Sequence, residues 1–375
     1  MSGNVLALKK RRCVYGAVLK NSPPQFSTLS RHPTLHDVAR ECGVSAMTVS
    51  RVLGGRDGVG EQTRRKVLTA ARRMHYHPSA LAINFARNRS GFIGVATHFE
   101  GLLGSYYFRN IMAGFQVALH GKHTDFALFD TISEVFEKPE ELAKLYRQRK
   151  TDGLLIVAPH QDDKYLKTLS RLGVAFVVVG ECVNDKSVPS VSCDDGQGVR
   201  LLCRHLRKLG HRDIAYIAGA DYLGSARRRR KAFVEFMRDE GISIPKHFIQ
   251  PGFYTADAGR SATLRILEAK RRPTAIVAAN DHAAVGVLEA LRERGIRVPE
   301  EISVAGFDDL LPAAVTNVTL TTVRQPLLEI GRAGAEILLK AIDTGQLAVG
   351  HTDVPVTLVT RDSTARVTSA TAKNS

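Results

Sequence analysis

Residues 34–55 read TLHDVARECGVSAMTVSRVLGG and contain two short helical patterns joined by a glycine. Thr34 begins a capping box, T-x-x-D, and Gly43 is a helix stop at the end of the apolar stripe that follows. Ser45 is placed to cap a second helix, and the glycine pair after Leu53 is placed to end it. The stretch therefore predicts a helix, a tight turn and a second helix.

The second of these helices has two unlike faces. One face is apolar, with residues repeating at i, i+3 and i+4: Val49, Val52 and Leu53. The face about half a turn away consists of Met47, Ser50 and Arg51. A third helical pattern covers residues 61–74, so three short helices fill residues 34–78. A helix-turn-helix motif presents its recognition helix to the major groove of DNA in this way.

The outward face of the second helix supplies the candidate DNA contacts. Arg51 is the strongest candidate for reading a base, because a guanidinium can donate to guanine O6 and N7 together. Ala46 and Met47 are suited to contact thymine methyl groups. Hydroxyl side chains are the candidates for DNA phosphates: Thr34, Thr48 and Ser50. The plainer interpretation is that Arg51 is a solvated charge and that Met47 fills the core.

The charge of the chain is concentrated at its front. The formal net charge is +16 at pH 7. Residues 1–90 contain sixteen Lys and Arg against four Asp and Glu, a net charge of +12, so the remaining 285 residues carry only about +4. Such a field attracts a polyanion to the predicted three-helix region.

Several classes of protein and site are disfavoured by composition. The five cysteines form no C-x-x-C pair and are odd in number, which argues against a disulfide framework or a zinc site and favours a reduced, cytoplasmic setting. We expect no metal, no cofactor and no membrane segment, because no run approaches about 18 apolar residues. The N-terminal basic cluster follows the first apolar residues, the reverse of a secretory signal. Residues 1–33 and 366–375 are expected to be a disordered basic extension and a disordered tail.

From Phe92 the pattern changes to short apolar runs that alternate with helical segments. The runs are FIGVA, FALFD, GLLIVAP, AFVVVGE, IAYIAG, AIVAAN and ISVAGF. This alternation predicts an α/β core of largely parallel sheets covered on both faces. Residues 91–365 hold enough runs for two doubly wound subdomains, with a break near residue 190 and a return near residue 320. Ligands of such sheets bind at the carboxyl ends of the strands, so a cleft between the subdomains is the candidate ligand site.

Residues 34–82 resemble the DNA-binding region of the lac and galactose repressor (LacI/GalR) family, whose pattern is roughly T-[IL]-x-D-V-A-x-x-A-G-V-S-x-x-T-V-S-R-V-L-N. The resemblance continues in the same order through LRKLGHRDIAYIAG, AIVAANDHAAVGVLEAL, VPEEISVAGFDD and LTTVRQP, and so spans residues 34–365. It implies a helix-turn-helix headpiece, a hinge helix over residues 79–90 and a two-lobed core like periplasmic sugar-binding proteins. It also implies a homodimer on a palindromic DNA operator, controlled by a sugar or sugar derivative.

The resemblance assigns the same base readers as the helix geometry, Ala46, Met47 and Arg51. It also implies a hinge that enters the minor groove, where Phe85, with Ala82 in the same segment, takes the place of the family's usual leucine. Phenylalanine is an admissible wedge between base steps. The hinge departs from the family's P-N-A-x-A-R, and the alternative is that the phenylalanine packs between the hinges of the two partner chains.

The resemblance also implies a set of effector-binding residues: Tyr107, Phe108, Asp194, Arg229, Tyr254 and Asp281. The chemistry agrees in part, because a carboxylate at a strand's carboxyl end accepts hydroxyl hydrogens from a sugar and an aromatic ring covers its apolar face. The alternatives are that Asn280-Asp281 caps the following helix and that the aromatic rings belong to the core. Two departures from the family pattern, Gly180-Glu181 and Val318-Thr319, leave the identity of the ligand open.

Two other classes of function compete with an effector-controlled repressor. A transport-type sugar-binding protein has no use for the basic headpiece. An enzyme on a doubly wound fold lacks a supporting motif, because the chain contains no G-x-S-x-G, P-loop or H-E-x-x-H. The glycines of GGRDGVG follow a helix and not a strand, which indicates a turn and not a dinucleotide-binding loop. We therefore expect a DNA-binding regulator and not an enzyme.

Overall fold

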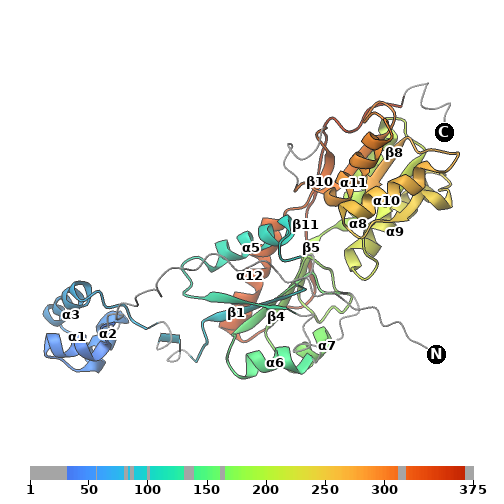
Figure 1. Cartoon of the computed structure of the whole chain (residues 1–375). Helices are drawn as coiled ribbons and strands as arrows, with labels where there is room; N and C mark the ends of the chain where they lie inside the picture. The colour runs from blue at the N-terminus through green and yellow to red at the C-terminus, as the bar shows by residue number, and fades with distance from the viewer. Residues whose placement is uncertain are drawn as a thin grey trace, which may run out of the picture. The chain divides into compact units, whose positions relative to one another are not determined.

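The computed structural model describes residues 32–55, 57–79, 83–84, 88–98, 102–130, 139–160, 165–310 and 318–367. The chain divides into two compact units, residues 1–79 and 80–375. Figure 1 shows the elements of both units, which we describe one at a time.

The first unit is a three-helix domain. Its helices are α1 (Leu35–Cys42), α2 (Ala46–Leu53) and α3 (Glu61–Arg73). The expected caps are confirmed: Thr34 and Asp37 form a capping box, the Ser45 hydroxyl accepts the backbone N–H of Thr48, and Gly43 takes the left-handed conformation with φ of 61°. All three helices contribute to one small core, which holds Val38, Val49 and Val67 at no exposure.

The second unit contains two six-stranded sheets, each the centre of one lobe. Lobe 1 has the strand order β11-β5-β4-β3-β1-β2 and lobe 2 the order β12-β10-β9-β8-β6-β7. Every pairing is parallel except that of β10 with β12. Doubly wound parallel sheets are therefore confirmed as the architecture of the core.

Lobe 1 is built mainly from the first half of the core. Its strands are β1 (Phe92–Thr97), β2 (Asp125–Asp130), β3 (Gly153–Val157), β4 (Phe176–Val179), β5 (Ser190–Cys193) and β11 (His351–Val354). Its helices are α5 (Tyr106–Leu119), α6 (Pro139–Arg147), α7 (Tyr165–Arg171) and α12 (Leu327–Thr344). Helices α5 and α12 pack together over one face of the sheet, and α6 and α7 cover the other (Figure 1).

Lobe 2 repeats this plan. Its strands are β6 (Ile214–Ala218), β7 (Ile249–Pro251), β8 (Ala275–Ala278), β9 (Ser303–Asp308), β10 (Thr321–Arg324) and β12 (Thr357–Val359). Its helices are α8 (Asp195–Lys208), α9 (Gly224–Asp239), α10 (Ala256–Leu267), α11 (Asp281–Glu293) and the short 3₁₀ turn η2 (Lys246–Phe248). Helices α8 and α9 pack as one pair, and α10 and α11 pack as another.

The chain passes between the lobes three times. It leaves lobe 1 after β5, returns after β10 to form α12, and crosses again between β11 and β12. The break near residue 190 and the return near residue 320 are confirmed, and the third crossing is additional. None of the helices in the described ranges combines the length and apolarity needed to cross a membrane.

Candidate nucleic-acid interface and ligand site

Helix α2 presents the candidate base readers as its pattern predicts. Val49 and Val52 are buried against α1 and α3, while the Met47 side chain is 65% exposed and Arg51 is exposed. Ala46 is half-buried at the start of the helix, where it packs against the same core. The outward orientation of Arg51 is confirmed, and base reading by these three residues stays a prediction.

The three candidate phosphate contacts differ in what they can offer. Ser50 is exposed on the outer face of α2, and the hydroxyl of Thr48 lies 2.9 Å from that of Ser45. Thr34 instead uses both its donors on Asp37, because its hydroxyl lies 2.6 Å and its backbone nitrogen 2.8 Å from the Asp37 carboxylate. Thr34 is therefore a helix cap, and its side chain reaches a phosphate only if the capping box opens.

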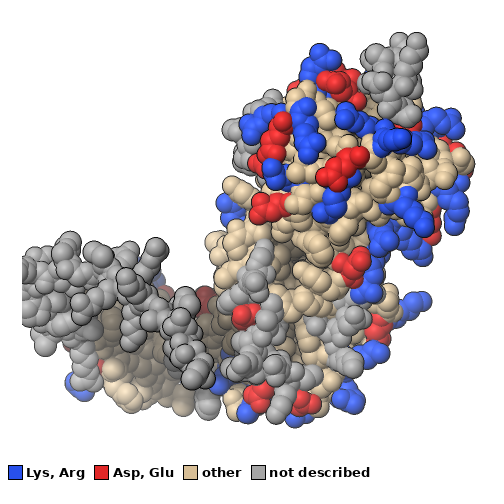
Figure 2. Space-filling view, turned by 45° about the vertical axis from the view of Figure 1, so that its right-hand side comes forward, with Lys and Arg blue, Asp and Glu red and all other residues tan. Residues whose placement is uncertain are grey.

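Three of the four acidic residues of the first unit pair with basic residues other than Arg51. Exposed ion pairs join Arg40 to Asp37, Arg65 to Glu61 and Arg73 to Glu41. Within the described part of this unit, Arg51 has no hydrogen bond or ion pair. On the visible face of the second unit, by contrast, Lys and Arg are interspersed with Asp and Glu (Figure 2). A free guanidinium on an outward helix face is available to a ligand without breaking an internal bond.

The expected hinge residues Ala82 and Phe85 lie outside the described residues.

In the second unit, three of the predicted effector residues occupy the space left by glycines at or near the carboxyl ends of strands. A β-carbon added at Gly180 would lie 2.2 Å from the Tyr107 hydroxyl, and one at Gly219 would lie 2.2 Å from the Tyr254 ring. A β-carbon at Gly306 would lie 2.3 Å from the Asp281 carboxylate. These glycines let two aromatic rings and a carboxylate lie directly against the backbone, near the strand ends where doubly wound sheets bind ligands. The residues that occupy these spaces are Tyr107, Tyr254 and Asp281.

Arg229 lies at the centre of a buried polar cluster. Its Nε donates to Asp195 Oδ1 at 2.7 Å, and its Nη1 donates to the carbonyl oxygen of Ala279 at 2.7 Å. The same Nη1 lies 3.6 Å from Asp308 Oδ1, and the guanidinium carbon lies 3.7 Å from the centroid of the Phe307 ring. Burial of a cation is tolerated because carboxylates and an aromatic face surround it. The inward orientation of Arg229 is therefore confirmed.

Asp281 is a second buried carboxylate in this cluster. Its two oxygens accept the Thr322 hydroxyl at 2.6 Å and the Leu310 backbone N–H at 3.0 Å. Burial raises the pKa of Asp281, and the charge of Asp308 raises it further, although the two hydrogen bonds oppose the shift. Burial also raises the pKa of Asp308, which Arg229 opposes. The two carboxyl groups therefore titrate as a linked pair, and the pKa for loss of the second proton is raised.

Glu181 of lobe 1 joins this cluster by bonding to lobe 2. Its carboxylate accepts the backbone N–H of Ser225 at 2.9 Å and Arg228 Nη2 at 3.0 Å, both from α9 of lobe 2. Helix α9 has no side-chain cap of its own, since Leu223 holds the N-cap position. A carboxylate from one lobe thus caps a helix of the other lobe.

Two of the predicted effector residues have other contacts. Asp194 caps α8 by accepting the N–H of Gln197 at 2.8 Å, whereas its neighbour Asp195 binds both Arg228 and Arg229. Phe108 is buried in the hydrophobic core of lobe 1. The alternative reading of Asn280 also holds, because its side-chain oxygen caps α11 at Ala283 N–H.

Sequence reasoning missed four polar residues of the cluster: Asp195, Arg228, Asp308 and Gln325. Gln325 donates to Asp308 Oδ1, and Arg228 donates to Asp195 and Glu181. The motif VAGFDD contains Asp308 at the carboxyl end of a predicted strand, and that position was the available signal.

Two parts of the chain match family models. Residues 34–79 match the model described as bacterial regulatory proteins, lacI family, and residues 203–364 match a periplasmic binding protein-like domain. The chain is 32% identical over 313 residues to the HTH-type transcriptional repressor PurR of Klebsiella pneumoniae, which covers 82% of this chain and 90% of that protein. It is 27% identical over 334 residues to the catabolite control protein A of Priestia megaterium, covering 88% and 99% of the two chains.

Solved structures with the same architecture carry DNA or sugars. The lac repressor dimer bound to operator and the anti-inducer ONPF matches with a TM-score of 0.79 at 30% identity, over 89% of this chain and 100% of that one. The complex of the transcriptional regulator CelR with cellobiose matches with a TM-score of 0.68 at 29% identity, over 88% and 99%.

Proposed function

The chain belongs to the lacI family of bacterial regulatory proteins, and we propose that it is a cytoplasmic repressor that binds a palindromic operator as a homodimer under the control of a polyhydroxylated ligand. Membership of this family establishes that the chain is a DNA-binding transcriptional regulator and not an enzyme. Repression, the dimer, the palindrome and the nature of the ligand are the proposed parts.

The observation that carries the DNA-binding role is the polarity of α2. Its inner face is fully occupied by core contacts, and its outer face carries Arg51 without an internal partner. Arg51 would bond guanine O6 and N7, and Ala46 and Met47 would contact neighbouring bases. Ser50 and Thr48 would set the register of the helix through phosphates.

A homodimer on a palindrome follows from the size of one headpiece. Three short helices with one recognition helix read a single half-site, and two-fold symmetry lets two copies read a palindrome. The lac repressor, which matches this chain over most of its length, is a dimer in its operator complex.

The ligand class is supported by the donors and acceptors at the carboxyl ends of the strands. The carboxylates of Asp281 and Asp308 would accept hydroxyl hydrogens of the ligand, as Asp281 accepts the Thr322 hydroxyl, while Arg229 would donate to ligand oxygens and Tyr254 would offer a ring face. The matching structure of CelR is a complex with cellobiose, and that of the lac repressor is bound to ONPG. We therefore assign Tyr107, Arg229, Tyr254, Asp281 and Asp308 to the ligand, with Asp194 and Phe108 supporting them as cap and core.

The salt dependence of DNA binding tests the headpiece against the transport-type alternative. A dimer that neutralises several phosphates should give a steep linear fall of log K with log salt on random-sequence duplex DNA. Full-length protein would be titrated by fluorescence anisotropy at several salt concentrations. A flat response would reject DNA binding and leave a sugar-binding protein.

The ligand class is tested by thermal shift on the full chain. Sugars, sugar acids and nucleobases would be screened, because a ligand that binds only the folded form raises its melting temperature. A compound that raises the melting temperature of the wild type should not raise that of the Asp281→Asn variant. A hit that stabilises this variant equally well would place the ligand elsewhere.

A further inference from the structure

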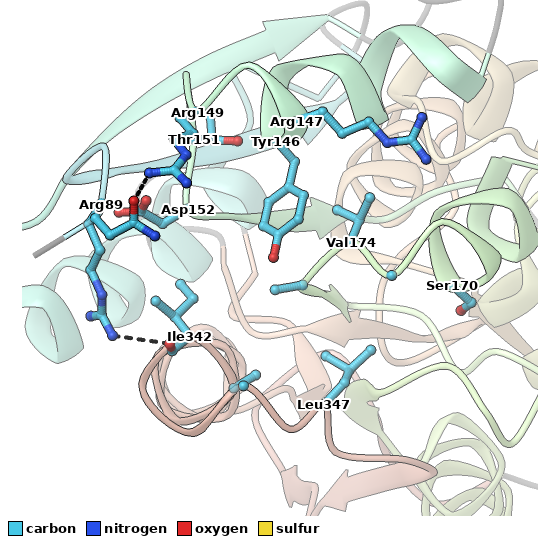
Figure 3. Close-up of a pocket in the computed structure, with 15 residues that line it drawn as sticks. Arg89, Tyr146, Arg147, Arg149, Thr151, Asp152, Ser170, Val174, Ile342 and Leu347 are labelled. Atoms are coloured by element: carbon cyan, nitrogen blue, oxygen red, sulfur yellow. Dashed lines mark hydrogen bonds between the residues drawn. The ribbon is translucent and has the colours of Figure 1, made fainter. Parts of the chain in front are cut away.

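Lobe 1 contains a cavity at the amino edge of its sheet, opposite the carboxyl ends that face the other lobe. The cavity has a volume of about 700 Å³ and lies among the segments that precede β1, β3 and β4 and the end of α12. Figure 3 shows Tyr146 in the middle of it, with Arg89 and Arg149 on one side and Arg147 on the other. The candidate ligand site between the lobes uses none of these residues.

The walls of the cavity combine cations with apolar surface. Arg89, Arg147 and Arg149 line it with Asp152 as the acidic lining residue, while Val174, Ile342 and Leu347 form an apolar side. Arg149 donates to the side-chain oxygen of Asn88, and Arg147 has no ion pair within the described ranges. Two lining hydroxyls, Thr151 Oγ1 and Ser170 Oγ, are buried without a hydrogen-bond partner in the described part of the chain. A net positive cavity with unsatisfied hydroxyls suits an anion.

Arg149 is held in a backbone conformation that disfavours its side chain. Its φ is +54°, in the left-handed region, at the position just past α6 where glycine usually ends a helix. The Schellman bond from Lys150 N–H to the Leu145 carbonyl, at 2.9 Å, fixes this turn. A glycine at this position would avoid the strain, so the arginine costs some stability.

The cavity is bonded directly to the segment that leads from the hinge into the core. Asp152 accepts the backbone N–H groups of Ser90 and Gly91 at 2.7 and 2.8 Å. Arg89 donates to Asp343 at 2.8 Å and to the Ile342 carbonyl at 3.0 Å, at the end of α12. A ligand that moves Arg89 or Arg149 therefore acts on the residues that connect the core to the headpiece.

We propose that this cavity binds a small organic phosphate, and that its occupancy changes the affinity of the protein for DNA. The phosphate lies against Arg149 and Arg89, and the organic body packs on the Tyr146 ring and the apolar side. Charge-assisted bonds from guanidinium groups supply the affinity, and the apolar wall favours an organic phosphate over inorganic phosphate. This second site is independent of the sugar class proposed for the cleft between the lobes.

Binding is tested on the full-length protein by isothermal titration calorimetry with AMP, ribose 5-phosphate and glycerol 3-phosphate. Adenosine and ribose serve as uncharged counterparts, and inorganic phosphate serves as the anion without an organic group. We expect at least one organic phosphate to bind, and Arg149→Gln to weaken it about tenfold or more. Arg171→Gln, which removes a charge from α7 outside the cavity, should leave binding unchanged.

A second variant separates ligand binding from a structural role. Arg149→Gly should raise the melting temperature, because it removes the left-handed strain, and yet weaken the phosphate as much as Arg149→Gln does. A purely structural arginine would instead lower the melting temperature when it is lost. Binding of no organic phosphate at millimolar concentration, or equal binding by the wild type and Arg149→Gln, would overturn the proposal. Loss of binding in Asp281→Asn, with Arg149→Gln unaffected, would also overturn it by placing the phosphate in the cleft.

The regulatory part is tested on DNA. The phosphate that binds should change the affinity of the wild type for its selected operator, and the operator should change the affinity for the phosphate by the same factor. Asp152→Asn removes the acidic group of the cavity and weakens the link to Ser90 and Gly91, so it should bind the phosphate at least as tightly as the wild type and yet reduce this factor. An operator affinity that stays constant at saturating phosphate would show that the site does not regulate DNA binding.

Discussion

Burial changes the acid–base properties of single residues in the core. Asp281 and Asp308 share a site in which both are nearly inaccessible, and each stays hydrogen-bonded to a hydroxyl, an amide or a backbone N–H. A buried pair of carboxyl groups is costly to ionise fully, so one proton is retained into the range where isolated Asp is charged. Such a pair can both donate to and accept from a ligand hydroxyl.

The pH dependence of stability reports this proton. The pKa of Asp281 is raised in the folded protein, so the folded state holds a proton that the unfolded chain has released, and the free energy of unfolding falls as pH rises through the folded pKa. We expect the wild type to lose stability relative to Asp281→Asn between about pH 5 and about pH 8, by at most about 1.4 kcal/mol per pH unit for one proton. Melting curves of both proteins across this range provide the measurement. A constant difference in melting temperature at every pH would contradict the raised pKa.

Arg51 gives a prediction about specificity. Arg51→Ala should weaken the operator selected from a random duplex library by roughly 10- to 100-fold, because one bidentate arginine–guanine contact discriminates by about 1–3 kcal/mol. Binding to random DNA should fall much less. Arg65→Ala is the matched control, because Arg65 is exposed on α3 and paired with Glu61. Equal losses on operator and random DNA would assign Arg51 to phosphates.

At this scale the sequence predicts which side of a helix faces outward better than which neighbour makes a contact. The faces of α2 followed from spacing alone, because apolar residues at i, i+3 and i+4 must be buried together. Asp194 and Asp195 could not be separated in this way. Both follow a strand end, and only the folded structure makes one a helix cap and places the other against two arginines.

At the scale of elements, the helices of the core pack by glycine contact. A β-carbon added at Gly114 on α5 would lie 1.8 Å from the Leu328 carbonyl oxygen of α12, and one at Gly331 would lie 2.0 Å from the Ile111 carbonyl oxygen. Helices α10 and α11 in lobe 2 approach each other through Gly259 and Gly286 in the same manner. The two lobes therefore share close helix contacts at glycines as well as the same strand order.

This close contact predicts the effect of one methyl group. Gly114→Ala must push α5 and α12 apart, because the obstruction is backbone, and should cost about 2–3 kcal/mol of unfolding free energy. The melting temperature should fall by several degrees. Gly104→Ala is the control, since nothing lies within 4 Å of its added β-carbon. Similar melting temperatures for the two variants would mean that α12 yields without cost.

The elements that the sequence predicted are those with enough apolar residues to show a pattern. All seven apolar runs form strands, whereas β5, β7, β10, β11 and β12 are three or four residues long and include SVSC, TTVR and HTDV. Short polar strands have no periodicity to detect, and they exist because a neighbouring strand supplies their hydrogen bonds. Strands β11 and β12 carry the third crossing between the lobes, so this crossing was missed with them.

At the scale of the whole molecule, polar contacts join the two lobes of the core. Glu181 of lobe 1 caps α9 of lobe 2 and bonds Arg228, and Arg228 and Arg229 both bind Asp195 where the chain enters lobe 2. A ligand changes the lobe arrangement only by its differential affinity for the two states, typically about 1–3 kcal/mol. Contacts of this kind set the equilibrium that the ligand has to shift.

The cap that crosses between the lobes can be tested by hydrogen exchange. Glu181→Gln removes the charge that stabilises the free N-terminus of α9 and leaves one acceptor for the Ser225 N–H. We expect faster amide exchange in the peptide that contains Ser225, since separation of the lobes exposes this amide. Arg230→Gln is the control, because Arg230 is exposed on the same helix and pairs within lobe 2 with Asp221. A ligand that closes the cleft should restore protection in Glu181→Gln. Unchanged exchange at Ser225 would mean that the lobes are held together without this cap.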